Sequence, residues 1–477
     1  KGTGAWTGRA LIDTATSGLY YGLWGKAIAD GDYVHAIWRA SSVDASGAAS
    51  TAIARNGQIG ELLYGRSSDG GATWGILSQG NPLIDSTYNL GFGGDSYSID
   101  AKNGVVAIAY SGISTDVGIL KSTDNGNTWT RTVIQQFPIP FFDEAHNLTD
   151  INNDGVVDTV DSNGEDAHVL IDDNGMCHVW FSAMRMLNDD TTDGSYSYFP
   201  NEDGMYYWNE SMGTNNYVLI TGVIDANGDG TINLPTSTTC SLLSGYYGGC
   251  GLTCMPSAGI DANGTIYLCY QSICEACDTT TFTSGSYQAR RHVYVMYSTD
   301  HGATWSTPED IVPTTAQGGS GEGQEAAYGC MARKVDSDIY ILYQRDTQPG
   351  NSLYTAGTCD EINNHGAGPS DIVVAKIPVS SLVGINNTQK PADFTVSQNY
   401  PNPATGETNI SVTLAKASSV QFEVTDVVGK VVYSEAYRNF VAGKNNITLN
   451  TQGFASGIYN YSVITNDNKV TKQMVVR

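Results

Sequence analysis

The segment Ser298-Thr299-Asp300-His301-Gly302-Ala303-Thr304-Trp305 indicates the fold, because its pattern occurs three times in the chain. The other copies span 67–74 and 122–129, and each reads Ser-x-Asp-x-Gly-x-Thr-Trp. An Asp carboxylate accepts hydrogen bonds from turn N–H groups, Gly adopts a positive φ readily, and Trp contributes a large apolar surface. We therefore predict three hairpin turns that brace the fold and have no catalytic role. Their structural residues are Ser67, Asp69, Gly71, Trp74, Ser122, Asp124, Gly126, Trp129, Ser298, Asp300, Gly302 and Trp305.

A longer repeat surrounds these turns. Each copy has an apolar residue, an Asp, a turn rich in Gly and Asn, and an apolar strand that ends in an aromatic residue. The five copies span 29–38, 99–110, 171–181, 260–270 and 335–343. Helical periodicity is nearly absent, so we predict an all-β chain in which each repeat contributes one four-stranded blade. The aromatic residues that end the strands are expected in the core: Trp38, Tyr110, Phe181, Tyr270 and Tyr343.

The Ser-x-Asp-x-Gly-x-Thr-Trp turns resemble the Asp-box, or BNR repeat, of sialidase-like β-propellers. The resemblance implies a propeller. Five repeats predict five blades, whereas six is the commoner number in the sialidase family, and a degenerate sixth blade could lie within residues 182–250. We favour five, with residues 6–12 adding a fourth strand to the last blade, because pairing the two ends removes an exposed sheet edge. The long loops would then lie on one face of the propeller, where function is usually carried.

Charge divides the chain into two parts. The 477 residues carry a net charge of −25, which disfavours nucleic acid as a partner. Residues 391–477 contribute +1 and the remainder −26, which predicts a domain boundary near residue 390. We assign residues 1–383 to the propeller, 384–393 to a linker and 394–477 to a second domain.

No apolar run approaches the roughly 18 residues of a membrane helix, so no transmembrane segment is expected.

Residues 394–477 resemble the C-terminal sorting domain of proteins exported by the type IX secretion system of Gram-negative bacteria. The resemblance rests on the segments 398–403 (QNYPNP), 426–432 (DVVGKVV), 457–459 (GIY) and the basic end 472–477. Apart from the resemblance, the alternating strands and Gly turns of these residues predict a small Ig-like β-sandwich. The resemblance implies export to the cell surface or beyond, with an outer-membrane barrel shuttle and a sortase as partners. No signal peptide begins at Lys1, and we expect that one has been removed.

Two segments have the spacing of calcium-binding loops. In the first, oxygen ligands alternate around the sharp turn at Gly155, and the carbonyl of Val156 completes the pattern. Its expected ligands are Asp150, Asn152, Asp154, Val156, Asp158 and Asp161. The second loop carries fewer charges, and its expected ligands are Asp225, Asn227, Asp229, Thr231 and Asn233. We predict that Ca²⁺ stabilises these loops and has no catalytic role.

All nine cysteines lie between Cys177 and Cys359. An odd number leaves at least one thiol unpaired. The predicted export implies an oxidising exterior, so we expect disulfides, with a zinc site as the alternative. We expect Cys177 and Cys269, which fall in strands, to be buried thiols.

Three arginines are candidates for ligand binding: Arg39, Arg185 and Arg345. Arginine pairs well with a carboxylate, and sialidases use three arginines in this way. The chain departs from that family, however, because it has no Phe/Tyr-Arg-Ile-Pro stretch near its start. The acids Asp95, Asp143, Glu144, Asp166 and Glu325 fall in no recognisable motif, so catalytic residues are not assigned.

The sequence leaves three functions open. We favour a secreted or cell-surface propeller that binds glycans or other surface polymers. One alternative is a sialidase-like glycoside hydrolase. The other is a structural subunit of a surface layer or filament.

Overall fold

The computed structural model describes the chain in segments, and all statements below concern these residues. They are 20–42, 57–76, 83–199, 202–225, 232, 249–275, 280–281, 287–288, 290–312, 324–347, 370–383, 394–414, 416–426, 430–465 and 469–477. The described fold is all-β, with one short helix, α2 (Val379–Val383). Contacts divide the chain into two compact units. Unit 1 is Lys1–Ile224 with Asn233–Val379, and unit 2 is Asp225–Ile232 with Ser380–Arg477. The expected linker 384–393 and residues 6–12 lie outside the described residues.

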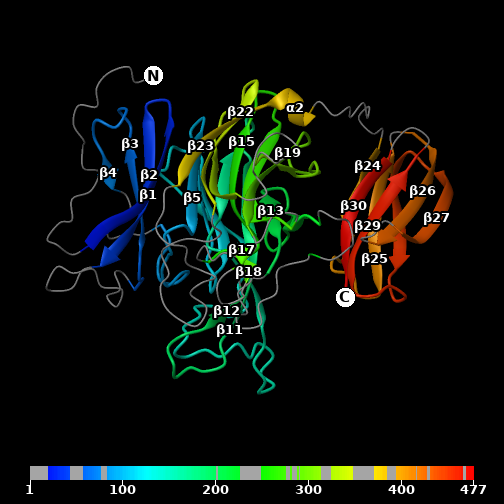
Figure 1. The fold of residues 1–477 in the computed structure, drawn as a ribbon, viewed down its shortest axis with the longest axis horizontal. Coiled ribbons are helices and arrows are strands. Elements are labelled where there is room, and N and C mark those ends of the chain that lie inside the picture. The colour runs from blue at the N-terminus through cyan, green and yellow to red at the C-terminus, as the bar shows by residue number, and fades with distance from the viewer. Residues whose placement is uncertain are drawn as a thin grey trace. The chain divides into compact units, whose positions relative to one another are not determined.

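Unit 1 contains five antiparallel sheets in which the main strands follow chain order (Figure 1). Sheet 1 comprises β1 (Tyr20–Asp30), β2 (Tyr33–Ser42), β3 (Leu62–Ser67) and β4 (Gly75–Ile76). Sheet 2 comprises β5 (Tyr97–Lys102), β6 (Val105–Tyr110), β7 (Val117–Ser122) and β8 (Thr130–Gln135). Sheet 3 comprises β10 (His168–Ile171), β11 (Cys177–Leu187), β13 (Met205–Asn209) and β14 (Val218–Thr221), and the end of β11 also pairs with β9 (Val160–Asn163) and β12 (Ser197–Tyr198).

Sheets 4 and 5 continue the series. Sheet 4 comprises β15 (Thr253–Ile260), β16 (Ile266–Ile273), β19 (Arg291–Ser298) and β20 (Glu309–Asp310). Sheet 5 comprises β21 (Glu325–Met331), β22 (Asp338–Asp346) and β23 (Asp371–Pro378). A separate ribbon joins β17 (Thr280–Thr281) to β18 (Tyr287–Gln288). Each of the five repeats found in the sequence therefore forms the hairpin between the first two strands of a sheet.

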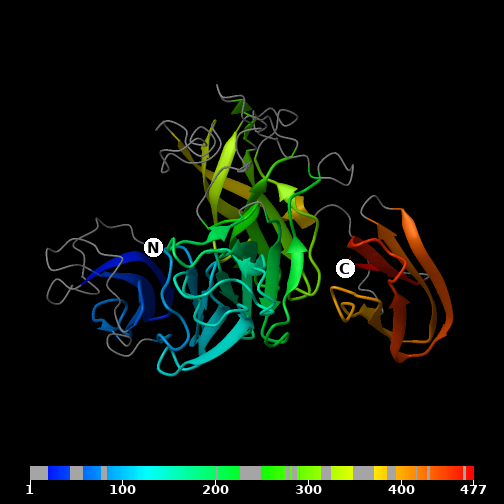
Figure 2. The ribbon, with the colours of Figure 1, turned by 90° about the horizontal axis from the view of Figure 1, so that it is seen from below.

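The sheets contact one another through their first strands. β1 contacts β5, β5 contacts β10, β10 contacts β15, and β15 contacts β21. From below, the sheets succeed one another in chain order from blue through cyan and green to yellow (Figure 2). The apolar clusters lie between neighbouring sheets, as where Ile37 and Tyr64 of sheet 1 meet Ile108 of sheet 2. The five aromatic residues expected in the core are all buried.

The three Ser-x-Asp-x-Gly-x-Thr-Trp motifs form nearly identical turns between the third and fourth strands of sheets 1, 2 and 4. In the first, the Thr73 amide and hydroxyl donate to the two Asp69 carboxylate oxygens at 2.8 and 2.6 Å. The Ser67 hydroxyl also donates to this carboxylate and accepts from the Gly71 amide. Hydrogen bonds from Thr73 and Ser67 lower the pKa of Asp69 to about 2, so the carboxylate stays ionised as a turn acceptor.

The turn of sheet 2 also packs on sheet 1. The Trp129 ring meets the Tyr64 ring edge-to-face with centroids 5.1 Å apart. Gly126 has φ of +80°, and a Cβ there would overlap the Tyr64 hydroxyl oxygen. That hydroxyl lies 2.7 Å from Nδ1 of the buried His35. The glycine is therefore required both by backbone conformation and by the close approach of the next sheet.

Sheets 3 and 4 repeat this contact. The Tyr207 hydroxyl lies 2.7 Å from His178 Nδ1 and donates to the His301 carbonyl oxygen at 3.0 Å. A Cβ at Gly302 would overlap this hydroxyl, and Trp305 packs edge-to-face on Tyr207. In sheets 2 and 4 the turn motif therefore has two structural functions: it closes its own hairpin and it joins its sheet to the preceding one.

Unit 2 is built from two sheets around one apolar core. One sheet comprises β24 (Phe394–Val396), β25 (Glu407–Leu414) and β28 (Gly443–Asn450). The other comprises β27 (Val431–Phe440), β26 (Ser418–Asp426), β29 (Gly457–Ile464) and β30 (Lys469–Val476). Alternate residues from both sheets, including Ile410, Phe422, Leu449 and Tyr461, form the core.

The QNYPNP segment is an anchor of unit 2. The Tyr400–Pro401 and Asn402–Pro403 peptide bonds are cis. The buried Asn399 side chain donates to the Pro401 carbonyl and to the Thr408 hydroxyl. The Asn402 side-chain oxygen accepts from the Val475 amide at 2.9 Å. These contacts join the segment to β25 and β30, so its unusual composition has a structural basis.

We predict that Gly126→Ala destabilises unit 1 more than Gly71→Ala. The two glycines share a motif position and a positive φ, but a Cβ at Gly71 would meet only the Trp74 ring, 4.0 Å away. The difference therefore isolates packing against Tyr64, and we expect it to be about 1–3 kcal/mol. All eight tryptophans lie within residues 6–305, so denaturation followed by tryptophan fluorescence reports on unit 1. Equal losses in the two variants would contradict the inter-sheet role of Gly126.

Candidate functional site

Unit 1 has a pocket of about 790 Å³ formed by residues of sheets 1 and 2 and of the segments beside them. Its walls come mainly from the segments 87–93, 111–116 and 136–144. These segments connect strands of one sheet or lead from one sheet to the next. The pocket thus lies among long connections held by rigid strands, as is common for binding sites.

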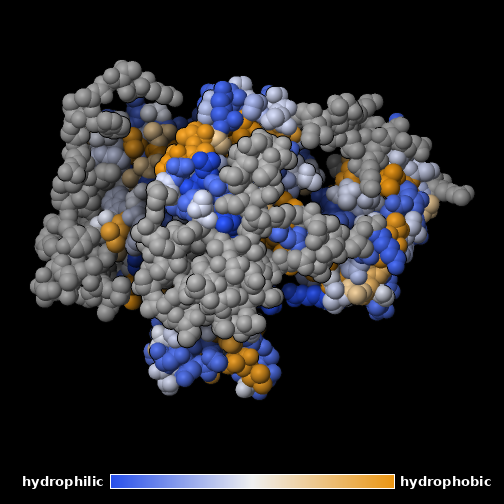
Figure 3. All heavy atoms as spheres, in the orientation of Figure 1, coloured by the Kyte–Doolittle hydropathy of each residue, from blue (hydrophilic) through white to orange (hydrophobic). Residues whose placement is uncertain are grey.

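Apolar side chains are exposed in this pocket. Tyr88 and Phe141 are each 52% exposed, and Ile59 and Leu90 are 43% and 40% exposed. Most of the described surface visible in Figure 3 is hydrophilic. Four large apolar side chains exposed at one pocket therefore suggest a surface that a ligand covers.

Charged groups alternate with these apolar side chains. The Arg131 guanidinium pairs with Asp116 at 2.9 Å and donates to the Tyr110 hydroxyl at 2.6 Å. It also lies 4.6 Å from the centre of the Tyr88 ring. The Arg131 guanidinium thereby packs against the Tyr88 ring, and about half of the tyrosine remains exposed.

Arg39 and Glu165 line another part of the pocket. Arg39 extends from β2 over the Trp24 ring, 5.5 Å from its centre. Burial, followed by the negative charge of Asp95, raises the pKa of Glu165, and the positive charge of Arg39 opposes this shift. Glu165 therefore keeps its proton to a higher pH than an ordinary glutamate, unlike Asp143 of the same pocket, whose pKa is lowered. Glu165 was not among the candidate acids selected from the sequence.

The first strands of three sheets share a backbone irregularity. β1, β15 and β21 carry the same bulge, in which a non-glycine residue has positive φ: Trp24 (49°), Met255 (53°) and Tyr328 (59°). Such bulges are frequent next to functional sites because they redirect side chains. Burial lowers the pKa of Lys26, beside the β1 bulge, although the Asp95 and Asp166 carboxylates oppose the shift.

The three arginines selected from the sequence are not brought together in this pocket. Only Arg39 lines it. Arg185 pairs with Asp161 at 3.2 Å and lies 3.7 Å from Glu202, and Arg345 pairs with Asp371 at 2.9 Å. Both pairs are partly exposed, at the ends of β11 and β22.

Asp143 and Glu144 do line the pocket. The Asp143 carboxylate lies 2.8 Å from His146 Nδ1 and accepts from the Ala145 amide. The hydrogen bond from His146 lowers the pKa of Asp143. Asp143, Ala145 and His146 thus form a local hydrogen-bond network within one loop, as their closeness in the sequence favours.

The first calcium-like loop is exposed and internally hydrogen-bonded. The Asp150 carboxylate accepts from the amides of Asp154 and Gly155 at 3.0 and 2.9 Å, and Gly155 has φ of +85°. At the last ligand position, Asp161 pairs with Arg185. In the second loop, Asn227, Asp229, Thr231 and Asn233 lie outside the described residues.

Two clusters of metal-ligating side chains occur among the described residues, and neither is a calcium loop. One is Asp166, Cys250 and Cys254, and the other is Cys274, His292 and Asp310. Cys274 is disulfide-bonded, so its sulfur is not available as a thiolate. Cys177, Cys250, Cys254, Cys269 and Cys330 are free, and all but Cys330 are buried. Cys240, Cys277 and Cys359 lie outside the described residues.

Comparison with known families identifies unit 2. Residues 398–477 match the family model of the secretion system C-terminal sorting domain. These residues are a type IX sorting domain. Such domains mark proteins exported to the cell surface or the exterior in Bacteroidetes, so this protein is exported. Partners in the type IX machinery follow from the same domain. In the described part of the chain, no helix has the length and apolar character needed to cross a membrane.

Solved structures resemble the chain only distantly, and no curated protein matches it. A polysaccharide lyase of family PL25, an ulvan lyase, is 10% identical, with 89% of this chain and 80% of that chain covered and a TM-score of 0.34. The α-L-arabinofuranosidase PaAbf62A from Podospora anserina is 13% identical, with coverage of 76% and 93% and a TM-score of 0.30. A family 43 arabinoxylan arabinofuranohydrolase from Bacillus subtilis is 11% identical, with coverage of 98% and 97% and a TM-score of 0.32. Likeness at this level transfers no activity to the chain.

Proposed function

We propose that unit 1 is a five-bladed Asp-box β-propeller. Its five sheets of sequential antiparallel strands meet through their first strands, which is how propeller blades pack. Three Asp-box turns support the same assignment. A further contact joins sheets distant in sequence, because Arg333, which follows β21, pairs with Asp100 of β5 and donates to the Ile171 carbonyl.

We propose that the pocket of unit 1 binds a glycan or another surface polymer. The observation that carries this proposal is the exposure of Tyr88 and Phe141 in a pocket that also holds Arg39 and Arg131. Sugar rings present apolar C–H faces and polar edges, so they match a surface that combines aromatic faces with charged hydrogen-bonding groups. Export by the sorting domain brings the pocket to where such polymers occur.

The two arginines of the pocket differ in whether they are already paired with a carboxylate. Arg131 is already paired with Asp116, whereas no carboxylate among the described residues lies within ion-pair distance of the Arg39 guanidinium. An acidic group on the ligand would therefore be recognised by Arg39 rather than by Arg131. Arg185 and Arg345 remain weaker candidates because each already pairs with a carboxylate.

A glycoside hydrolase is the second candidate. The pocket contains one carboxyl with a raised pKa, Glu165, and one with a lowered pKa, Asp143. Environments that separate the pKa values of two carboxyls allow one to act as general acid and the other as a carboxylate. This difference makes Glu165 the candidate general acid of the pocket.

We also propose that Ca²⁺ binds the loop that carries Asp150, Asn152, Asp154, Val156, Asp158 and Asp161. The support is the ligand spacing and the turn at Gly155, whose amide donates to Asp150. Arg185 Nε donates to one Asp161 carboxylate oxygen at 3.2 Å, so Asp161 would have to accommodate both the arginine and the ion. The loop leads directly into β9, so an ion would hold the paired ends of β9 and β11.

We predict that soluble acidic and neutral polysaccharides bind the full chain and that Tyr88→Ala and Phe141→Ala each weaken binding about 2–10-fold. Isothermal titration measures this loss. Tyr340→Ala is the matched control, because Tyr340 is 43% exposed and lies outside the pocket. Arg39→Ala should affect acidic polymers alone. Undiminished binding in the Tyr88→Ala/Phe141→Ala double variant would place the ligand elsewhere.

For hydrolysis we expect no release from a fluorogenic sialoside. The deciding assay measures new reducing ends from a polysaccharide that binds. Loss of roughly 10²–10⁴-fold in Glu165→Gln would establish a general acid and favour the second candidate. Glu202→Gln serves as the control, since burial also raises the pKa of Glu202 but this residue does not line the pocket. Polysaccharide binding without new reducing ends would exclude hydrolysis of that polymer.

Calcium should raise the midpoint of thermal unfolding of unit 1. At 100-fold excess over Kd the ion adds about 2.7 kcal/mol to the free energy of unfolding, because it binds the folded loop. Tryptophan fluorescence with calcium or with chelator measures the shift. We expect Asp154→Ala to abolish it and Asp193→Ala, in an exposed turn outside the loop, to retain it. An equal calcium response in both variants would show that another site binds the ion.

A further inference from the structure

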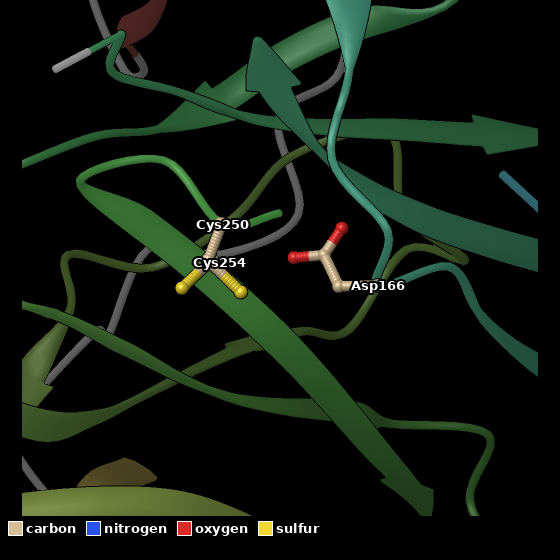
Figure 4. Close-up of side chains that lie close together, drawn as sticks. All are labelled: Asp166, Cys250 and Cys254. Carbon is tan, nitrogen blue, oxygen red and sulfur yellow. The ribbon is translucent and has the colours of Figure 1, made fainter. Parts of the chain in front are cut away.

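Three fully buried side chains of unit 1 bring a carboxylate and two thiols together. The ligand atoms of Asp166, Cys250 and Cys254 all lie within 4.8 Å of one another. Figure 4 shows the Asp166 carboxylate facing the side of the two neighbouring cysteines. Asp166 lies just before β10 of sheet 3, whereas Cys254 lies in β15 of sheet 4. The cluster therefore joins two sheets, and its residues lie in or next to the first strand of each.

The carboxylate of Asp166 is held in place from both sheets. One oxygen accepts from the Ser182 amide at 3.1 Å and from the Ser182 hydroxyl at 2.9 Å. The other accepts from the Met255 amide at 2.8 Å. Met255 follows Cys254 and forms the β15 bulge, so the bulge that redirects the strand also directs its amide toward Asp166. Oδ2, which accepts this single hydrogen bond, retains capacity for a further interaction.

The sulfur of Cys254 is surrounded by hydrogen-bond donors. The Gln271 side-chain amide donates to it at 3.3 Å, and Arg291 Nη1 lies 3.7 Å away. Arg291 also donates to the carbonyls of Leu252 and Gly251, at 2.7 and 2.9 Å. It thereby shapes the short loop that joins the two cysteines. Donors around a sulfur stabilise a thiolate and orient it as a metal ligand.

We propose that Asp166, Cys250 and Cys254 bind one Zn²⁺ ion that joins sheet 3 to sheet 4. Sulfur and carboxylate ligands are a donor set that zinc accepts, and three protein ligands leave one tetrahedral position for another group. Loss of the two thiol protons adds two negative charges, which the ion neutralises, and the Arg291 guanidinium places a positive charge beside Cys254. The donors to Cys254 match a metal-bound thiolate better than the neutral sulfur of a disulfide.

The ion is expected to be structural. All three ligands are buried, and none lines the pocket described above. The proposal is thus independent of glycan binding. It also differs from the calcium loop in chemistry, since calcium selects oxygen ligands and zinc accepts thiolates.

The first test measures zinc in the full chain as isolated and after reduction with added zinc. We expect one zinc ion per chain. Cobalt substituted for zinc should give the absorption of cobalt–thiolate charge transfer. Cys250→Ser and Cys254→Ser should lose both signals, whereas Cys330→Ser, which removes an exposed cysteine outside the cluster, should retain them. Retention of cobalt–thiolate absorption in Cys254→Ser would overturn the assignment.

A graded variant separates loss of zinc from failure to fold. Gln271→Leu removes one donor to Cys254 but no ligand, and we expect it to weaken zinc binding roughly 10–100-fold. The state of the thiols provides a test without any variant. A Cys250–Cys254 disulfide in peptides of the isolated protein would overturn the proposal. Free thiols that take up no zinc after reduction would also overturn it.

Discussion

The close approach of a turn glycine in the Ser-x-Asp-x-Gly-x-Thr-Trp motif to a tyrosine hydroxyl of the preceding sheet organises unit 1. Gly126 meets Tyr64 between sheets 2 and 1, and Gly302 meets Tyr207 between sheets 4 and 3. In both places a histidine of the second strand holds the hydroxyl at 2.7 Å. Burial and the nearby Arg66 lower the pKa of His35 to about 4, so its ring stays neutral at neutral pH. The sheets are thus joined by shape, and sheets 3 and 4 also by the hydrogen bond from the Tyr207 hydroxyl to the His301 carbonyl.

This rigid frame explains how the pocket is formed. Because the turns at Gly126 and Gly302 fix neighbouring sheets, the longer connections that carry Tyr88 and Phe141 are held at their ends by strands. The exposed aromatic faces are then supported by ion pairs such as Arg131–Asp116 rather than by burial. A pocket of this kind can remain open without a ligand, because its polar groups are largely satisfied within the protein.

Charged groups are concentrated near the first strands. Lys26, Asp95, Glu165 and Asp166 act on one another electrostatically, although they come from the segments of three sheets. Asp166 is the buried member of this group, and burial raises its pKa despite its hydrogen bonds from Met255 and Ser182. Burial of an ionisable group disfavours its charged form, which is why these hydrogen bonds matter for the Asp166 carboxylate.

The all-β class, the five first hairpins, the Ser-x-Asp-x-Gly-x-Thr-Trp turns and the sorting domain could be predicted from the sequence. The turns depend on residues close together in the chain, such as Ser67, Asp69 and Thr73, whose hydrogen bonds span at most four positions. In contrast, the sequence did not reveal that Glu165 lines a pocket with Tyr88, that Arg185 pairs with Asp161, or that Asp166 meets Cys254. Those pairings join separate strands or separate sheets. They depend on strand register, bulges and burial, which long-range packing sets and local spacing does not reveal.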